Sequence, residues 1–148
     1  MVCYYFKKKY LNHLNIYIKY GIIRLTKKLG GITMETIALK TYTSYEVLSD
    51  LRKIMKDSWI LQEVRMDYDT RNLPEECIID SYPVTLIFEE FEKKFAVKIL
   101  SLSVGYGGSG PHDFSKLLEF FDIQYNEEDI FTKRSMEKDG HIRLVYTK

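Results

Sequence analysis

The stretch from Gly105 to Pro111 contains the residues whose types and spacing are best suited to binding chemistry. Four of the chain's eight glycines lie between Gly105 and Gly110, where an apolar run ends and a helical pattern begins. A Gly-rich turn at a helix start presents unpaired N–H groups, and the helix dipole favours negative charge there. The stretch therefore predicts an anion-binding loop. The alternative is a tight strand-to-helix connection that needs glycine for its geometry alone.

This loop differs from the two common phosphate-binding motifs. It lacks the Lys-Ser/Thr pair and the four-residue spacer of a P-loop. Gly105, Gly107 and Gly110 satisfy the GxGxxG spacing, but neither the surrounding βαβ unit nor the later ribose-binding acid of a dinucleotide site is evident. Tyr106 and Ser109 add an aromatic ring and a hydroxyl, and these two side chains favour contact with a ligand.

A bound anion would need positive charge from outside the loop, which contains no Lys or Arg. His112 follows the loop directly, and the other candidates are cations expected in strands or at a strand end. An Arg fork on a phosphate would be the strong form of such a site, although each cation could equally face solvent. The predicted ligand-binding residues are Gly105, Tyr106, Gly107, Gly108, Ser109, Gly110, His112, Arg65, Arg71, Lys98 and Arg143.

No catalytic constellation accompanies the loop. His112 would be a general acid or base in an enzyme, but His112 and Asp113 are equally explained as first-turn helix residues. The sequence has no CxxC motif and no Asp/Glu/His cluster with the spacing of metal ligands. We therefore expect no catalytic residue, metal or cofactor, and a binding protein in preference to an enzyme.

The segment Ser103–Pro111, followed by an apolar helix with Leu117 and Leu118, resembles a loop of small uncharacterised proteins from phages and bacterial plasmids. The resemblance covers only the loop and this helix, and it implies a mobile-element origin. By association it implies action by binding in the cytoplasm of a bacterial host. Such a protein would either sequester a host signalling nucleotide or block a host defence protein.

The periodicity from Thr36 onwards predicts one α+β domain over residues 34–148, with the order β-α-β-β-β-α-(α)-β. We expect a mainly antiparallel sheet of about five strands with two or three helices on one face. Strands are predicted at 36–42, 59–68, 84–88, 95–104 and 142–146, and helices at 45–57, from 111 and from 126.

Individual residues mark several expected boundaries. Ser44 is predicted to cap the first helix, and Asn126 with the three acids after it is predicted to start the last. Pro111 suits the first position of the middle helix, where its missing N–H costs nothing. The hairpin turn is expected at residues 92–94 and another turn at 138–140.

The first 33 residues have a different composition. They contain seven basic residues and no acid, which leaves 15 basic and 21 acidic residues and a net charge of about −6 in residues 34–148. The segment suits a basic membrane-surface helix or, less well, a targeting peptide. Alternatively, it is translated upstream sequence, because Lys28–Met34 can be back-translated to a ribosome-binding sequence followed by ATG. We expect Met34 to be the biological start.

Composition also limits the classes of partner that the protein is expected to bind. The acidic charge of residues 34–148 argues against duplex DNA, and no apolar run is long enough to cross a membrane. Two cysteines, Cys3 and Cys77, favour a reducing compartment. As an alternative to a phosphate-bearing small molecule, the partner is a host protein, bound at a strand edge or an acidic face. The sequence does not decide between a monomer and a homo-oligomer. The acids of that face are Glu75, Glu76, Asp80, Glu89, Glu90 and Glu92.

Overall fold

The computed structural model describes residues 14–19, 22–29, 32–41 and 43–148. In this part of the chain, seven strands form one sheet in the order β1-β2-β3-β6-β5-β4-β7. The strands are β1 (Leu14–Lys19), β2 (Ile22–Leu29), β3 (Ile32–Leu39), β4 (Ile60–Asp69), β5 (Val84–Glu90), β6 (Lys93–Ile99) and β7 (His141–Thr147). The helices are α1 (Val47–Ile54), α2 (Ser109–Phe120) and α3 (Glu127–Phe131), with short 3₁₀ turns η2 (Ser44–Glu46) and η3 (Ile79–Ser81).

The predicted α+β class is confirmed, and strands β3 to β7 correspond to the five predicted strands. The sheet is mixed, because β3 and β6 run parallel, from the pair Glu35–Phe95 to the pair Leu39–Ile99. The other neighbouring strands are antiparallel. After β3 the chain passes through α1 to β4, which lies two strands beyond the neighbour of β3 in the sheet, next to the edge strand β7. The β5–β6 hairpin then brings the chain back beside β3. Alternation along one strand does not encode this order.

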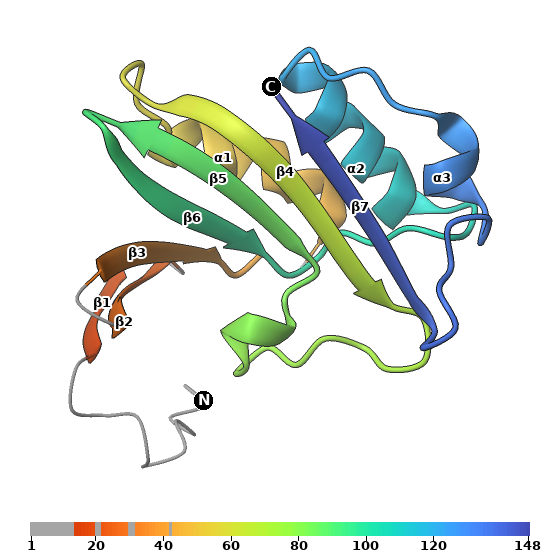
Figure 1. Ribbon diagram of the computed structural model, residues 1–148, viewed down its shortest axis with the longest axis horizontal. Coiled ribbons are helices and arrows are strands. Elements are labelled where there is room, and N and C mark those ends of the chain that lie inside the picture. The colour runs from red at the N-terminus through yellow and green to blue at the C-terminus, as the bar shows by residue number, and fades with distance from the viewer. Residues whose placement is uncertain (1–13, 20–21, 30–31, 42) are drawn as a thin grey trace.

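Helices α1 and α2 cover one face of the sheet (Figure 1). The strands direct alternate apolar side chains toward them, so that Val84, Leu86 and Phe88 of β5 are fully buried. From the helix side, Leu51 of α1 and Leu117 of α2 are also fully buried. These residues belong to one continuous core, which is why α2 and the loop before it have a fixed position on this face.

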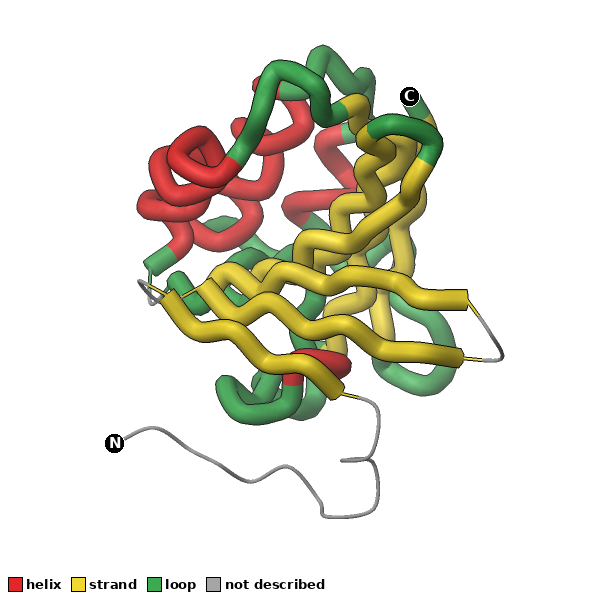
Figure 2. Tube along the Cα trace, turned by 90° about the vertical axis from the view of Figure 1, so that its left-hand side faces the viewer, coloured by secondary structure: helices red, strands yellow, loops and turns green. Residues whose placement is uncertain are grey.

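The opposite face of the sheet is partly covered by the segment between β4 and β5. Ile79 of η3 and Tyr82 pack against Ala38 of β3 in a small second cluster. Lys40 pairs with Glu76, which fixes the same segment electrostatically. The sheet is also strongly twisted, so β1 to β3 lie nearly crosswise to the strands behind them (Figure 2).

Four local expectations need correction. Helix α2 begins at Ser109, so Pro111 is its third residue and not its first. Ser44 does not cap α1, because its hydroxyl donates to Asp113 Oδ2 (2.5 Å) and so ties η2 to α2. The hairpin turn lies at Phe91 and Glu92, one residue earlier than expected. The return strand β6 ends at Ile99, and residues 100–108 follow without regular structure.

Several other expectations are confirmed. The Asn126 side chain accepts a hydrogen bond from the Glu128 N–H (3.0 Å) and caps α3. Gly140, with φ of +81°, makes the turn before β7. In contrast, the helical interpretation of the N-terminal segment is wrong for residues 14–19, which form strand β1. Residues 1–13 lie outside the described part of the chain. Within the described part, every helix is too short or too polar to span a membrane.

Candidate functional site

The Gly-rich loop enters through Gly105, whose conformation and contacts both require glycine. Its φ of +92° lies in the left-handed region, and a Cβ there would lie 2.6 Å from Ile142 Cδ1. Its N–H donates to the Ile130 carbonyl (2.7 Å), which joins the loop to α3. This buried glycine therefore anchors the loop, and its N–H is not free to bind a ligand.

Tyr106 folds back over the loop and packs against two further glycines. The hydroxyls of Tyr106 and Ser103 lie 2.7 Å apart, so they share a hydrogen bond. A Cβ on Gly108 would lie 2.6 Å from Tyr106 Cε2, and a Cβ on Gly110 would overlap Ser103 Oγ. In contrast, a Cβ on Gly107 would meet no described heavy atom within 4 Å beyond its chain neighbours. Three glycines are thus explained by internal packing, and Gly107 is open to solvent.

The N-terminus of α2 lacks a side-chain cap, and its first residue, Ser109, is exposed, whereas Gly110 and Pro111 are buried. Its N-cap is Gly108, in extended conformation with φ of 179°, and neither a capping side chain nor an acidic residue of the described chain satisfies that turn. The Gly108 carbonyl accepts the His112 N–H (3.1 Å) as the helix starts. Tyr106, Gly107, Gly108 and Ser109 are exposed. The exposed N–H groups at this end are therefore those of Gly107, Gly108 and Ser109, because Gly110 is buried and Pro111 has no N–H, and the positive end of the helix dipole lies beside them.

His112 and Asp113 do not form an acid–base pair. His112 is exposed, whereas Asp113 is buried and accepts hydrogen bonds from Ser44 (2.5 Å) and Lys116 (3.4 Å). The Asp113 carboxylate thus joins α2 to η2 and has a structural role. His112 lies one turn into α2, on the same end of the helix as the exposed loop.

Arg65 and Lys98 lie on the sheet face opposite the loop. Val64 and Met66 flank Arg65 and are buried on the helix side, so Arg65 projects from the other face, where it pairs with Glu63. Lys98 lies on the same open face and reaches Asp80 at 4.0 Å. The sheet therefore separates both cations from the Gly-rich loop.

Arg143 belongs to a charged cluster at the corner formed by β4, β7 and the turn before β7. Its guanidinium contacts Asp139 (2.8 Å), Asp67 (3.4 Å) and Glu137. Hydrogen bonding to Asp139 raises the pKa of Arg143, and the same contact lowers the pKa of the Asp139 carboxyl. This arginine is fully engaged with carboxylates and does not reach the loop.

Arg71 and His141 complete this corner cluster. Arg71 lies against Gly140, where a Cβ would be 2.6 Å from its Nε, and pairs with Asp69 at 3.4 Å. His141 Nδ1 lies 2.5 Å from Asp67 Oδ1. Hydrogen bonds from the Asn72 side chain and the Arg71 N–H hold the pKa of Asp69 at about 2. The cluster is self-satisfied, which fits a structural role.

Two residues near the loop were missed by sequence reasoning. Tyr68 of β4 has a pKa raised by burial and, secondarily, by the nearby Tyr106 and Asp69. Lys133 has its Cγ 3.8 Å from the position of a Cβ on Gly105, and its ammonium forms no ion pair with another described residue. Lys133 follows α3, and its approach to the loop depends on tertiary packing that no sequence motif signals.

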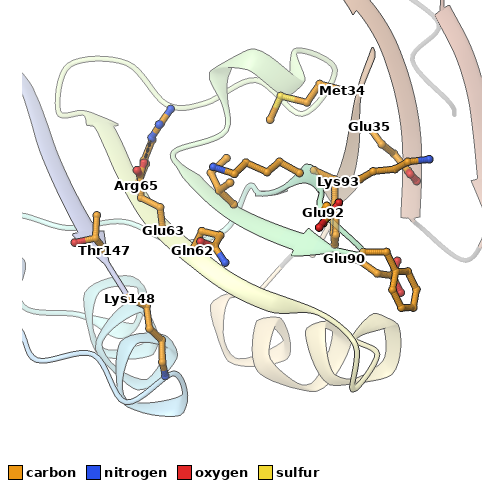
Figure 3. Close-up of a pocket in the computed structure, with 14 residues that line it drawn as sticks. Met34, Glu35, Gln62, Glu63, Arg65, Glu90, Glu92, Lys93, Thr147 and Lys148 are labelled. Atoms are coloured by element: carbon orange, nitrogen blue, oxygen red, sulfur yellow. Dashed lines mark hydrogen bonds and ion pairs between the residues drawn. The ribbon is translucent and has the colours of Figure 1, made fainter. Parts of the chain in front are cut away.

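A hollow of about 1320 Å³ lies on the open face of the sheet, near the β5–β6 turn (Figure 3). Arg65, Glu63 and Gln62 of β4 lie on one side of it and Met34 and Glu35 of β3 on the other. Its charged lining is balanced, with four acids and four bases: Glu35, Glu63, Glu90, Glu92, Arg65, Lys93, Lys94 and Lys148. This balance does not favour an anion over a cation, so the hollow has no distinct ligand chemistry.

Comparison of the chain with protein-family models, curated proteins and solved structures finds no match. Among the described residues, no group of three or more His, Cys, Asp or Glu side chains is arranged to hold a metal ion. Function must therefore be inferred from the geometry of the loop, the sheet and its edges.

Proposed function

We propose that the protein is a non-catalytic binding protein that holds a phosphate-bearing small molecule at the N-terminus of α2. The observation that carries this proposal is the uncapped N-terminus of a 12-residue helix, which is preceded by the exposed residues Gly107 and Gly108 and begins at the exposed Ser109. Such a turn offers N–H donors and positive potential to one anionic group. Pairing of the Tyr106 hydroxyl with Ser103 holds the loop in place before a ligand arrives, which reduces the ordering cost of binding.

The contact residues differ in part from those expected from sequence. Gly107, Gly108 and Ser109 offer backbone N–H groups, and Tyr106 offers a half-exposed ring on which a base can stack. Positive charge comes from Lys133 and, when protonated, from His112. The ion-paired cations on the other face and at the corner are left out of the proposed site: Arg65, Arg71, Lys98 and Arg143.

The proposed biological role is sequestration of a host signalling nucleotide in the bacterial cytoplasm. One support is the resemblance of residues 103–111 to a loop of phage and plasmid proteins. The other is that the Tyr106 ring, which can stack on a base, lies beside a proposed phosphate site, so the two together suit a nucleotide. A binding protein without turnover lowers the free concentration of its ligand stoichiometrically. A cell containing the protein is therefore expected to show a lower free level of that nucleotide.

Calorimetric titration with inorganic phosphate and with linear and cyclic nucleotides tests this function. A ligand at 100-fold its Kd should add about 2.7 kcal/mol to the free energy of unfolding. Gly107→Asp places a carboxylate in open space at the anion site and should abolish binding while the fold persists. Gly107→Ala is the matched control and should retain binding. Absence of heat and of thermal stabilisation with every ligand would refute the proposal.

The alternative partner, a host protein bound at an acidic face, is less well supported. Glu76 pairs with Lys40, and Asp80 lies 4.0 Å from Lys98. Glu90 accepts hydrogen bonds from Ser58 (2.6 Å) and Lys56 (3.4 Å), and these donors lower its pKa. Much of the acidic surface is thus already neutralised within the chain, which leaves a strand edge as the better interaction surface.

A further inference from the structure

Strand β7 forms one edge of the sheet and pairs with β4 on its inner side (Figure 1). Lys148 N–H donates to the Gln62 carbonyl (3.0 Å), and Thr70 N–H donates to the Gly140 carbonyl (3.0 Å). These two bonds identify the hydrogen-bonded pairs of the antiparallel register, which alternate along it. Backbone groups of Ile142, Leu144 and Tyr146 therefore point toward β4, and those of Arg143, Val145 and Thr147 point outward.

The first part of this outer edge is already covered by the preceding chain. The His141 carbonyl accepts the Glu137 N–H (2.7 Å), and Met136 forms a single antiparallel bridge with Ile142. No further backbone partner for β7 is found among the described residues. The uncovered part of the edge is therefore residues 143–147.

This uncovered edge lacks the usual protection against strand addition. Natural edge strands are commonly protected by Lys, Pro or a bulge, whereas β7 has the sequence HIRLVYT and pairs with β4 in unbroken register. Val145 lies at the middle of the uncovered part and is 62% exposed. The one cation, Arg143, has its charge compensated by three carboxylates of its own chain. Nothing at this edge repels an incoming strand.

We infer that β7 pairs antiparallel with β7 of a second copy of this chain, centred on Val145. In that register Val145 lies opposite Val145 of the second copy, and Arg143 lies opposite its Thr147. The outward N–H and C=O groups of these residues then satisfy one another, and no two like charges are placed opposite each other. The two sheets join into one continuous sheet across a two-fold axis.

The side chains on the helix side of β7 support the same register. Leu144 of one copy would lie opposite Tyr146 of the other, and both residues are half-buried against the core of their own chain. Pairing covers the part of each side chain that a single copy leaves at the edge. A strand of another protein would satisfy the backbone groups equally. Only a second copy of this chain places Val145 opposite Val145 and Leu144 opposite Tyr146 in the same register.

Sedimentation equilibrium of the full chain, with Val145→Lys as the disrupting variant, tests this pairing. The wild-type protein should have twice the chain mass, and Val145→Lys should have the chain mass, because it places two ammonium groups opposite each other. Val145→Thr is the matched control and should stay dimeric. A wild-type chain mass at all concentrations, or a dimer that persists in Val145→Lys, would overturn the inference.

Amide exchange gives a second readout that needs no variant. The N–H groups of Arg143, Val145 and Thr147 point outward, so exchange in a single copy is rapid, and pairing should slow it as the protein concentration rises. Rapid exchange of all three at every concentration would overturn the inference. This outcome is independent of the phosphate titration, because the loop before α2 is not part of the proposed interface.

Discussion

The hydroxyl groups of Ser103 and Tyr106 lie 2.7 Å apart and close the Gly-rich loop on itself. Because of this contact, the Tyr106 ring occupies the space that a side chain at residue 108 would need, and the Ser103 hydroxyl occupies the space at residue 110. The loop is therefore rigid on its inner side and open at Gly107. Gly105, Gly108 and Gly110 are thus explained by the tight geometry of the connection, and Gly107 is the position left open for a ligand.

Replacement of Gly110 by Ala should destabilise the protein, because the new Cβ would overlap Ser103 Oγ. Overpacking of this kind typically costs about 1–3 kcal/mol. Gly107→Ala is the matched control and should change the free energy of unfolding by no more than about 0.5 kcal/mol, since the new methyl group enters open space. Urea denaturation measures both values. Equal losses at the two positions would contradict the packing described for Ser103 against Gly110.

Acid should weaken the corner cluster through Asp69, whose pKa falls from 3.8 to about 2 in the folded chain. A lowered folded-state pKa stabilises the protein above the unfolded-state value, and that stabilisation is lost as the pH falls through the folded-state value. Asp69→Asn should therefore reduce the pH dependence of unfolding between about pH 4 and pH 2. Urea midpoints across this range measure it. An unchanged dependence in the variant would show that Asp69 does not contribute.

The β5–β6 turn should be improvable, because Phe91 and Glu92 have φ of 51° and 64°. Positive φ at both central residues is typical of a type I′ turn, which favours Asn-Gly, and other residues pay about 1–2 kcal/mol each for such backbone angles. The double variant Phe91→Asn, Glu92→Gly should raise the free energy of unfolding by about 1–3 kcal/mol, because relief at both residues is partly offset by the greater unfolded-state entropy of glycine. Phe91→Ala removes the ring but keeps the unfavourable φ, so it should not stabilise. Loss of stability in the double variant would refute this assignment.

A chain beginning at Met34 is expected to fold with the same stability as the full chain. Strand β3 keeps five paired residues with β6, and its side chains Ile37 and Leu39 remain in the core. The truncation does remove β2, which pairs with β3 from Ile22–Leu39 to Leu29–Ile32. Urea denaturation of both chains measures the difference. A loss of several kcal/mol would identify residues 1–33 as an integral part of the fold.

Local features of the fold were predictable from sequence because they depend on neighbouring residues. The period-two pattern of Val84, Leu86 and Phe88 gave strand β5, and Asn126 gave the start of α3. The parallel pairing of β3 with β6 was not predictable, because it depends on the path of the chain across the whole sheet. The same pattern could not show that β1 and β2 extend the sheet beyond β3.

The candidate site was predictable only in its local part. The loop and the start of α2 lie where the glycine pattern indicated. The predicted cations lie in strands or directly after one, but successive side chains of a strand point to opposite faces of the sheet. The position of a cation in a strand therefore does not show whether it faces the loop. Arg65 and Lys98 belong to the face opposite the loop, while Lys133 approaches the loop from the segment after α3. Which face a residue occupies relative to a distant loop is set by tertiary structure.

Amide chemical shifts of the isotope-labelled protein, recorded during titration with inorganic phosphate and then with nucleotides, test the central claim most directly. We predict that the N–H resonances of Gly107, Gly108 and Ser109 shift in a saturable manner and that those of the sheet corner around Arg143 do not. The Gly107→Asp variant should show no shift at the same ligand concentrations. Unchanged loop resonances with every ligand, or shifts confined to the open face of the sheet, would contradict the proposed site.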